Sequence, residues 1–256
     1  MRLIAAVTAL ASSMVLAGCI AKGTNPDDPY ESVNRKIHKF NMAFDATMLK
    51  PPARLYKAVI PGPVRAGINN AYNNINMIPT VGNDLLQGEW SYAIKDTWRF
   101  LVNSTFGVAG FFDVADQRFS LPPHSNDLGL TFAKWGDKKS PYIVLPFLGP
   151  STIRDGMGNM FEYSIMTPYP YLKSDALIYG LLGLRYVDLR SQLFDTERLM
   201  DEALDPYAFV RDAYLQHRNY LINGDAVDSL YVEDDNSVNS SDYVDDVAEP
   251  AVTKKG

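Results

Sequence analysis

Residues 28–41 read DPYESVNRKIHKFN, and this stretch has the spacing of an amphipathic helix. Pro29 and Glu31 stand where the first helical turn would begin, as is common at a helix N-terminus. Apolar residues recur three or four positions apart and would form one face: Val33, Ile37, Phe40 and Phe44. Polar residues between them would face water: Asn34, Arg35 and Lys36. The stretch therefore predicts a helix at the start of the body and favours a mainly α fold.

The sequence upstream of this helix has the features of a secretory signal peptide. Arg2 is followed by an apolar run from Leu3 to Leu16, which is shorter than the roughly 20 residues that a membrane-spanning helix needs. We therefore expect residues 1–18 to be cleaved. The segment LAGC at residues 16–19 resembles the lipobox of bacterial lipoproteins, in which the cysteine receives a diacylglycerol and an N-acyl chain.

Cys19 is the only cysteine in the chain, so it cannot form an internal disulfide, and a specific role in lipidation becomes the better interpretation. Two or more acyl chains anchor a protein stably to a membrane. Ile20 stands where an aspartate would resemble an inner-membrane retention signal, and this favours the outer membrane. We expect residues 19–27 to form a lipidated linker.

Composition and charge limit the classes of function. About 238 of the 256 residues remain after cleavage, enough for one domain with a substantial core. Residues 19–224 carry no net charge, whereas residues 225–256 hold nine acidic residues and two lysines. A neutral body lacks the basic face that nucleic-acid binding requires, so we exclude that class. The acidic segment 225–256 has little apolar content and is predicted to be a disordered tail.

Periodicity, proline and glycine divide the rest of the body into further helices. They are expected from Ala53 to about Val59, from Val64 to Asn74, between Gly82 and Asn103 with a break near Gly88, from Leu172 to Arg190, from Asp195 to Leu204, and from Pro206 to Ile222, ending at Gly224. Between Gln117 and Pro150 the sequence favours loops, and only Tyr142–Leu145 is long enough for a strand. We expect little or no sheet.

The apolar stripes of these helices have two explanations. No apolar run beyond the signal peptide reaches the length of a membrane-spanning helix. Amphipathic helices rich in aromatic residues and leucine fit a body that lies in the membrane interface. The same stripes also fit an ordinary helical core, and periodicity alone leaves both interpretations open.

Four segments in order resemble the MlaA family of lipoproteins, also called VacJ, and the resemblance extends from the lipobox to about Gly224. They are DPYESVNRKIHKFN at 28–41, RFLVNSTFGVAGFFDVA at 99–115, PYIVLPFLGPSTIRDGMG at 141–158 and LDPYAFVRDAYLQHR at 204–218. The resemblance implies one helical domain, residues 28–224, built as a single ring-like bundle of amphipathic helices in the periplasmic leaflet of the bacterial outer membrane. It also implies a polar passage by which mislocalised phospholipids leave the outer leaflet, which maintains lipid asymmetry.

The same resemblance implies partners but no chemistry. Family members work beside trimeric porins and hand phospholipid to a soluble periplasmic carrier, which an inner-membrane ABC-type transporter unloads. Neither ATP nor a metal ion nor another cofactor would bind this chain; the acyl chains on Cys19 are covalent, and phospholipid is the transported ligand. The loop Asp137-Lys138-Lys139-Ser140 departs from the family's glycine-rich turn, so its local contacts are expected to differ.

Two groups of residues are candidates for the passage. Phe40 and Asn41 match the family's FN motif and would gate or shape it, although a core phenylalanine beside a packing asparagine explains them equally well. Polar residues set within apolar stretches fit a headgroup path: Arg99, Asn103, Arg154, Asp155 and Arg185. For Arg154 and Asp155, a structural ion pair or a helix cap is an equal alternative.

Catalysis and metal binding are not expected from the sequence. His38, His124 and His217 are far apart, and no HExxH, CxxC or carboxylate spacing indicates a metal site. No G-x-S-x-G motif marks a serine nucleophile, so we do not expect an enzyme. The main alternative to transport is a lipid-anchored scaffold or adaptor for porins, which would have a closed core without a polar passage.

Overall fold

The protein is mainly α-helical, as predicted. The computed structural model describes residue 23 and residues 25–235, and within this part the only sheet is the antiparallel hairpin of β1 and β2, in which Tyr142 pairs with Thr152. The elements in chain order are α2 Glu31–Phe44, a π-helical turn Asp45–Leu49, α3 Lys50–Val59, α4 Gly62–Gln87, α5 Trp90–Thr105, α6 Val114–Phe119, α7 Leu128–Lys134, β1 Tyr142–Leu145, β2 Gly149–Thr152, α8 Ile153–Ile165, a 3-10 turn Tyr169–Tyr171, α9 Asp175–Gln192, a 3-10 turn Leu193–Asp195, α10 Glu197–Asp201 and α11 Pro206–Asp235.

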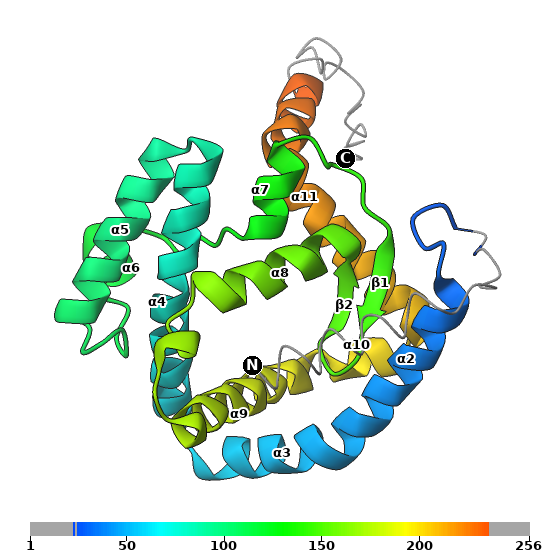
Figure 1. The fold of residues 1–256 in the computed structure, drawn as a ribbon, viewed down its shortest axis with the longest axis horizontal. Helices are drawn as coiled ribbons and strands as arrows, with labels where there is room; N and C mark the ends of the chain where they lie inside the picture. Colours follow the sequence, from blue (N-terminus) through cyan, green and yellow to red (C-terminus); the bar gives the residue numbers. More distant parts are fainter. Residues whose placement is uncertain (1–22, 24, 236–256) are drawn as a thin grey trace, which may run out of the picture.

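The helices are arranged as a ring (Figure 1). α2 and α3 follow one another along its lower edge, α9 packs against α3, and α4 forms the left side of the view. α8 lies above and the hairpin to the right, so that no described helix or strand crosses the space that these elements surround. The α4–α5 pair projects on the left as an antiparallel helical hairpin. This arrangement agrees with the predicted ring of helices.

The ring is closed where the first and last helices meet. The Asp28 carboxylate is fully buried and accepts hydrogen bonds from the Tyr207 hydroxyl at 2.5 Å and from Asn34 Nδ2 at 2.8 Å. Arg211 Nη1 lies 3.4 Å from the same carboxylate. Asn34 also bonds the backbone of β1, through the carbonyl of Tyr142 at 3.1 Å. Residues from α2, β1 and α11 are therefore joined by one buried polar cluster.

Prolines did not limit the helices as the sequence suggested. The helix expected to begin at Ala53 begins at Lys50, because Pro51 and Pro52 lie in the first turn of α3, where a backbone N–H has no helical partner to lose. The short helix expected at residues 64–74 is instead the 26-residue α4, which contains Pro79. The break near Gly88 is confirmed, since Gly88 ends α4 in the left-handed conformation with φ 74°.

Three further boundaries differ from the expectations. α7 lies in a region predicted to be loop, where the Asp127 side chain accepts a hydrogen bond from Leu130 N and caps a helix of two turns. The helix expected at residues 195–204 is a 3-10 turn followed by the short α10. α11 continues through Gly224, which costs a helix only about 1 kcal/mol, and ends at Asp235. The predicted disordered tail is thus wrong for residues 225–235; the remainder of it lies outside the described residues.

Helices α7 and α8 cross at two glycines, and this close approach gives a first prediction. A Cβ on Gly158 would lie 2.7 Å from the backbone nitrogen of Gly129, which is backbone and cannot rotate away. Gly158→Ala is expected to lower the free energy of unfolding by about 1–3 kcal/mol through overpacking. Denaturant unfolding followed by circular dichroism measures the change.

Gly180→Ala is the matched control for this substitution. Gly180 lies within α9, and a Cβ there would meet no atom of the described residues within 4 Å. Alanine is therefore expected to stabilise that helix by about 0.5–1 kcal/mol. Equal stabilisation by both substitutions would contradict the close contact between α7 and α8.

Candidate functional site

The distribution of polar and apolar side chains is inverted relative to an ordinary soluble domain. Among the described residues, the buried set comprises 21 polar or charged residues and only 13 hydrophobic ones, while 39 large hydrophobic residues are exposed. The buried apolar cluster contains just Tyr142, Val144 and Tyr207. Soluble proteins bury apolar side chains and rarely expose large continuous apolar patches. The outer surface of this protein is therefore suited to an apolar environment.

Helix α5 shows the inversion within one element. Its inward face carries Asp96, Arg99 and Asn103, all buried. Its outward face carries aromatic and aliphatic residues, with Ile94 59% exposed and Trp98 58% exposed. A shallow groove of about 440 Å³ between α4 and α5 is lined almost wholly by apolar side chains: Val81, Leu85, Trp90, Ala93, Ile94, Thr97, Trp98 and Leu101.

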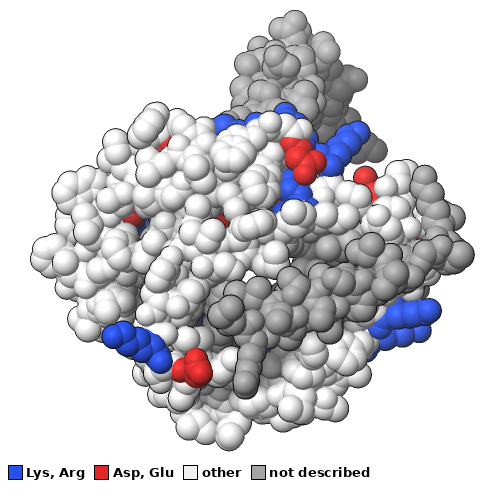
Figure 2. Space-filling model, in the orientation of Figure 1, with Lys and Arg blue, Asp and Glu red and all other residues white. Residues whose placement is uncertain are grey.

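The face drawn in Figure 2 is largely free of charge. Lysine, arginine, aspartate and glutamate appear there as a few separate patches, and uncharged side chains cover most of the described surface between them. Within residues 23 and 25–235, none of the helices combines the length and the apolar character needed to cross a membrane.

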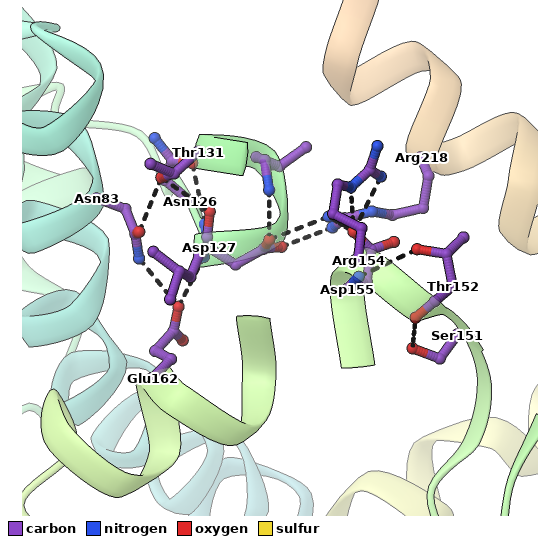
Figure 3. Close-up of polar contacts among 12 residues, drawn as sticks. Asn83, Asn126, Asp127, Thr131, Ser151, Thr152, Arg154, Asp155, Glu162 and Arg218 are labelled. Carbon is purple, nitrogen blue, oxygen red and sulfur yellow. Dashed lines mark hydrogen bonds and ion pairs between the residues drawn. The ribbon is translucent and has the colours of Figure 1, made fainter. Parts of the chain in front are cut away.

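The interior contains a chain of charged hydrogen bonds (Figure 3). Asp155 on α8 is 2% exposed and accepts hydrogen bonds from Arg154 Nε at 2.9 Å, Arg218 Nη2 at 2.8 Å and the Tyr214 hydroxyl at 2.8 Å. Arg218 on α11 also donates two hydrogen bonds to Asp127 at the start of α7. Burial alone would raise the pKa of Asp155, but the hydrogen bond from Arg154 and the charge of Arg218 hold that pKa below its usual value.

A second part of this network joins α4 to α7 and α8. Asn83 Nδ2 donates to Glu162 at 2.9 Å, and Glu162 also accepts from the backbone of Leu128 at 2.9 Å. Asn83 Oδ1 accepts from the Thr131 hydroxyl at 2.8 Å. Burial raises the pKa of Glu162. Polar contacts, more than apolar packing, hold these helices together.

The structure gives the predicted passage residues Arg154 and Asp155 a structural role. Both are buried in the ion pair described above, and Asp155 also lies in the first turn of α8, where its backbone N–H is capped by Thr152 at 3.1 Å. Arg154 Nη1 donates to the carbonyls of Asp137 and Lys138 at 2.9 and 3.2 Å. The loop that departs from the family pattern is therefore held by Arg154, which favours the ion-pair alternative over a headgroup path.

Arg99 and Asn103 are also held by protein groups. Both are buried, Arg99 forms an ion pair with Asp113 at 2.5 Å, and Asn103 donates to the same carboxylate at 3.0 Å. Asn103 Oδ1 accepts from the backbone of Ala115 at 2.8 Å. These contacts fasten the segment that follows α5 against it. They favour a structural role for both residues over a place in a headgroup path.

Phe40 and Asn41 contact the tip of the β-hairpin. Asn41 Nδ2 donates to the carbonyl of Leu145 at 2.9 Å, and its Oδ1 accepts from Phe147 N at 2.8 Å. Phe40 is 48% exposed and its ring meets that of Phe147 edge to face, with centroids 5.2 Å apart. The two residues therefore position the hairpin tip on α2, and Phe40 is not a core residue.

Arg185 on α9 differs from the other predicted arginines because its hydrogen-bond partners are neutral. It donates to Asn69 Oδ1 at 2.8 Å and to Asn73 Oδ1 at 3.1 Å, both on α4. The carboxylate of Asp188 is 3.9 Å away. Burial lowers the pKa of Arg185, and the neighbouring cavity of about 190 Å³ is lined mostly by polar side chains, including Asn69 and Asp188.

One polar cluster was not foreseen from the sequence. Asp84 on α4, Asp96 on α5 and His124 in the loop before α7 place one possible ligand atom each within 4.8 Å of the others. Both aspartates are buried, and His124 Nδ1 lies 2.5 Å from Asp96 Oδ2. Burial raises the pKa of Asp84 to about 6, and the hydrogen bond with Asp96 raises the pKa of His124. Because no sequence motif joins these residues, spacing could not have revealed them.

Cys19, the predicted lipidation site, lies outside the described residues, so its role stays a prediction from the sequence.

Comparison with known proteins shows relatives that cover most of this chain. The family described as MlaA lipoprotein matches residues 26–221. Proteins named intermembrane phospholipid transport system lipoprotein MlaA, from Escherichia coli (strain K12) and Shigella flexneri, are each 32% identical over 222 residues, which cover 82% of this chain and 85% of the relative. A solved structure described as "Structural basis for maintenance of bacterial outer membrane lipid asymmetry" is 30% identical, has a TM-score of 0.68, and is aligned over 77% of this chain and 99% of its own.

Proposed function

The chain belongs to the MlaA lipoprotein family, and from this premise we propose that it is an outer-membrane lipoprotein that removes mislocalised phospholipids from the outer leaflet. The lipid headgroup would move through a polar passage in the ring, toward the periplasm, while the acyl tails stay in contact with apolar surface. The result is an outer membrane whose two leaflets keep different lipids.

The inverted distribution of side chains is the observation that supports this proposal. A phospholipid that leaves a leaflet needs a polar route for its headgroup, because burying a charged group in hydrocarbon without partners is costly. It also needs an apolar surface for its tails. The polar interior of the described chain and its 39 exposed large hydrophobic residues fit these two requirements. A porin scaffold without transport has no need of either.

Arg185 is the predicted residue best placed to contact a headgroup. Its direct hydrogen-bond partners are the neutral amides of Asn69 and Asn73, and the carboxylate of Asp188 lies at the outer limit of salt-bridge distance, 3.9 Å away. A guanidinium forms strong, charge-assisted hydrogen bonds with phosphate oxygens. The exchange of amide partners for a phosphate would cost little, and we therefore propose Arg185 as a transient headgroup contact.

The position in the membrane and the partners form the finer part of the proposal. The apolar outer surface fits the periplasmic leaflet, with the acyl chains on Cys19 as the anchor. Trimeric porins would hold the ring in place, a soluble periplasmic carrier would receive the lipid, and an inner-membrane ABC-type transporter would unload the carrier. The proposal includes no chemical step, because removal of lipid downstream is sufficient to drive the movement.

The test is the phospholipid content of the outer leaflet in cells that lack the protein. A strain without it, and strains carrying Cys19→Ala or Arg185→Gln, are expected to show more outer-leaflet phospholipid than a strain with the wild-type chain. Arg185→Gln keeps a hydrogen-bonding side chain but removes the charge, so its defect should be partial.

Arg198→Gln is the matched control, because Arg198 is 81% exposed and pairs only with Glu202 on the surface of α10. This variant is expected to match the wild type. An unchanged outer leaflet in the strain that lacks the protein would exclude transport and favour the scaffold. A normal outer leaflet in the Arg185→Gln strain, together with a defect in the other two strains, would exclude Arg185 as a headgroup contact.

A further inference from the structure

Three elements bring Asp84, Asp96 and His124 together near the turn of the α4–α5 hairpin. Asp84 is fully buried near the end of α4, and Asp96 is 2% exposed on the inner face of α5. His124 comes from the loop between α6 and α7, and its side chain is 29% exposed. The carboxyl groups of Asp84 and Asp96 are close enough to share a hydrogen bond if one of them carries a proton. Two buried acids thus face each other beside one imidazole.

The charge of this cluster is not balanced as it is at other buried aspartates. Each of the other three buried aspartates has an arginine within salt-bridge distance: Asp28 has Arg211, Asp155 has Arg218, and Asp188 has Arg185. Among the described residues, neither Asp84 nor Asp96 has an arginine or lysine within that distance. The other charged group that acts on His124 is Glu89, which is also acidic. Only the imidazole of His124 can offset the charge of the two acids, so the cluster has at most one positive charge for two carboxylates.

One oxygen of the cluster also lacks a partner. Asp84 Oδ1 accepts a hydrogen bond from Asn126 Nδ2 at 2.8 Å. Asp84 Oδ2 is buried and has no hydrogen-bond partner among the described residues. A buried carboxylate oxygen without a donor or a cation is costly, and buried polar atoms in folded proteins nearly always have a partner. An unpartnered oxygen on a fully buried side chain in this cluster points to a ligand that completes it.

We propose that Asp84, Asp96 and His124 bind a divalent transition-metal ion, with Zn²⁺ the best match to the donors. Two carboxylate oxygens and one imidazole nitrogen form a common zinc ligand set, and a water completes it. The ion would supply further positive charge and a partner for Asp84 Oδ2. This inference departs from the absence of metal expected from the sequence, and it does not depend on lipid transport.

The surroundings of the three side chains fit this assignment. Asn126 orients Asp84, as outer hydrogen-bond partners orient metal ligands. The Tyr92 ring stacks on His124, with centroids 4.6 Å apart and planes 20° apart, and so fixes the plane of the imidazole. Zinc ligand atoms lie about 2.0–2.2 Å from the ion, so the side chains close around it, and the partly exposed His124 gives the ion a route from solvent.

Zinc binding would fasten the loop before α7 to the α4–α5 hairpin. The ion would add a direct link among three segments that are joined here by the His124–Asp96 and Asn126–Asp84 hydrogen bonds. Because the site is absent in the unfolded chain, binding free energy is added to folding free energy. The ion would therefore be a structural one, which stabilises the projecting part of the ring.

The test uses the full mature protein in detergent, stripped with a chelator and titrated with Zn²⁺ by calorimetry. One ion per chain is expected, together with a rise in Tm on zinc addition. Asp84→Asn and His124→Gln are each expected to weaken binding by about 100-fold or more, since each removes a direct ligand. His217→Gln, which changes an exposed histidine on α11, is the control and should bind as the wild type does.

Three results would overturn the assignment. The first is the absence of zinc uptake by the wild type. If Asp84→Asn also raises Tm in the absence of metal, then a proton shared by Asp84 and Asp96 offsets their charge in place of an ion. The second is equal binding by all variants, which would mark an adventitious ion only. The third is tighter binding of Ca²⁺ or Mg²⁺ than of Zn²⁺. Circular dichroism of each variant establishes that it is folded, so that lost binding reports on the site.

Discussion

Asp155→Ala is expected to lower the free energy of unfolding by about 3–5 kcal/mol, the usual cost of removing one partner from a buried ion pair. Asp155 is the shared acceptor of Arg154, Arg218 and Tyr214. Its loss leaves two guanidinium groups buried without their common carboxylate and releases α8 from α11. Denaturant unfolding in detergent, followed by circular dichroism, measures the change.

Asp195→Ala is the surface control for this prediction. Asp195 pairs with Lys57 at 3.0 Å, but its side chain is 82% exposed, so the substitution should change stability by no more than about 1 kcal/mol. Equal effects of the two substitutions would mean that the interior network contributes no more than a surface pair.

The ion pair also has a defined pH range. The pKa of Asp155 is lowered in the folded protein, so its contribution is complete above the pKa of an unfolded aspartate, about 3.9. The contribution is lost only as the pH falls through the lower folded-state value. The difference in stability between wild type and Asp155→Ala should therefore be constant at neutral pH and shrink in strong acid.

The second large effect is expected on the outer face of α5. In a chain whose anchor is removed by Cys19→Ser, Ile94→Asp is expected to weaken binding to phospholipid vesicles by about 100-fold. An aspartate within the hydrocarbon of a membrane costs about 3 kcal/mol, and each 1.4 kcal/mol corresponds to about tenfold in affinity. Flotation of the protein with vesicles on a density gradient measures the affinity.

Two control substitutions test whether weaker vesicle binding comes from a charge placed in hydrocarbon, and not from the substitution or the added charge in itself. Ile94→Leu keeps the apolar surface and should keep wild-type binding. Gln117→Asp adds the same charge at an exposed polar position on α6 and should have only a small effect. Vesicle binding by Ile94→Asp at the wild-type level would show that this face of α5 does not contact lipid.

The sequence predicted which segments are helical better than it predicted which side of a helix is buried. On α2 the spacing of Val33 and Phe40 was correct for a helix, but Asn34, expected to face water, is buried and Phe40 is exposed. Periodicity identifies an apolar face and a polar face on opposite sides of a helix. The usual interpretation is that the apolar face is turned inward. That assumption fails when the polar side forms the interior.

The helix boundaries failed for a different reason. Pro79 would end most helices, yet α4 passes through it, at the loss of the hydrogen bond that an N–H at this position would donate to the carbonyl four residues earlier. The packing of α4 against α5 holds the helix across that position. Tertiary packing leaves no local sign in the sequence, and so a single long helix was divided into two.

The candidate site residues were predictable only as far as residue type allows. Arg154 and Asp155 were correctly recognised as a possible ion pair because they are adjacent. Asp84 and His124 meet across three elements, and their proximity follows from how α4, α5 and the following loop pack. Side-chain chemistry can be read from a sequence, but a cluster assembled from distant segments requires the fold.

The closure of the ring by α2 and α11 has a consequence for how the chain acquires its structure. Asp28 and Arg211 are separated by 183 positions, so the contact that completes the circle joins the beginning of the body to almost its last element. Long-range contacts form slowly, because the entropy of the intervening chain is lost before they do. During synthesis and export, earlier helices can pair locally, as α4 does with α5, but the body remains an open arc until α11 is available. Maturation thus ends with a single late ring-closing event.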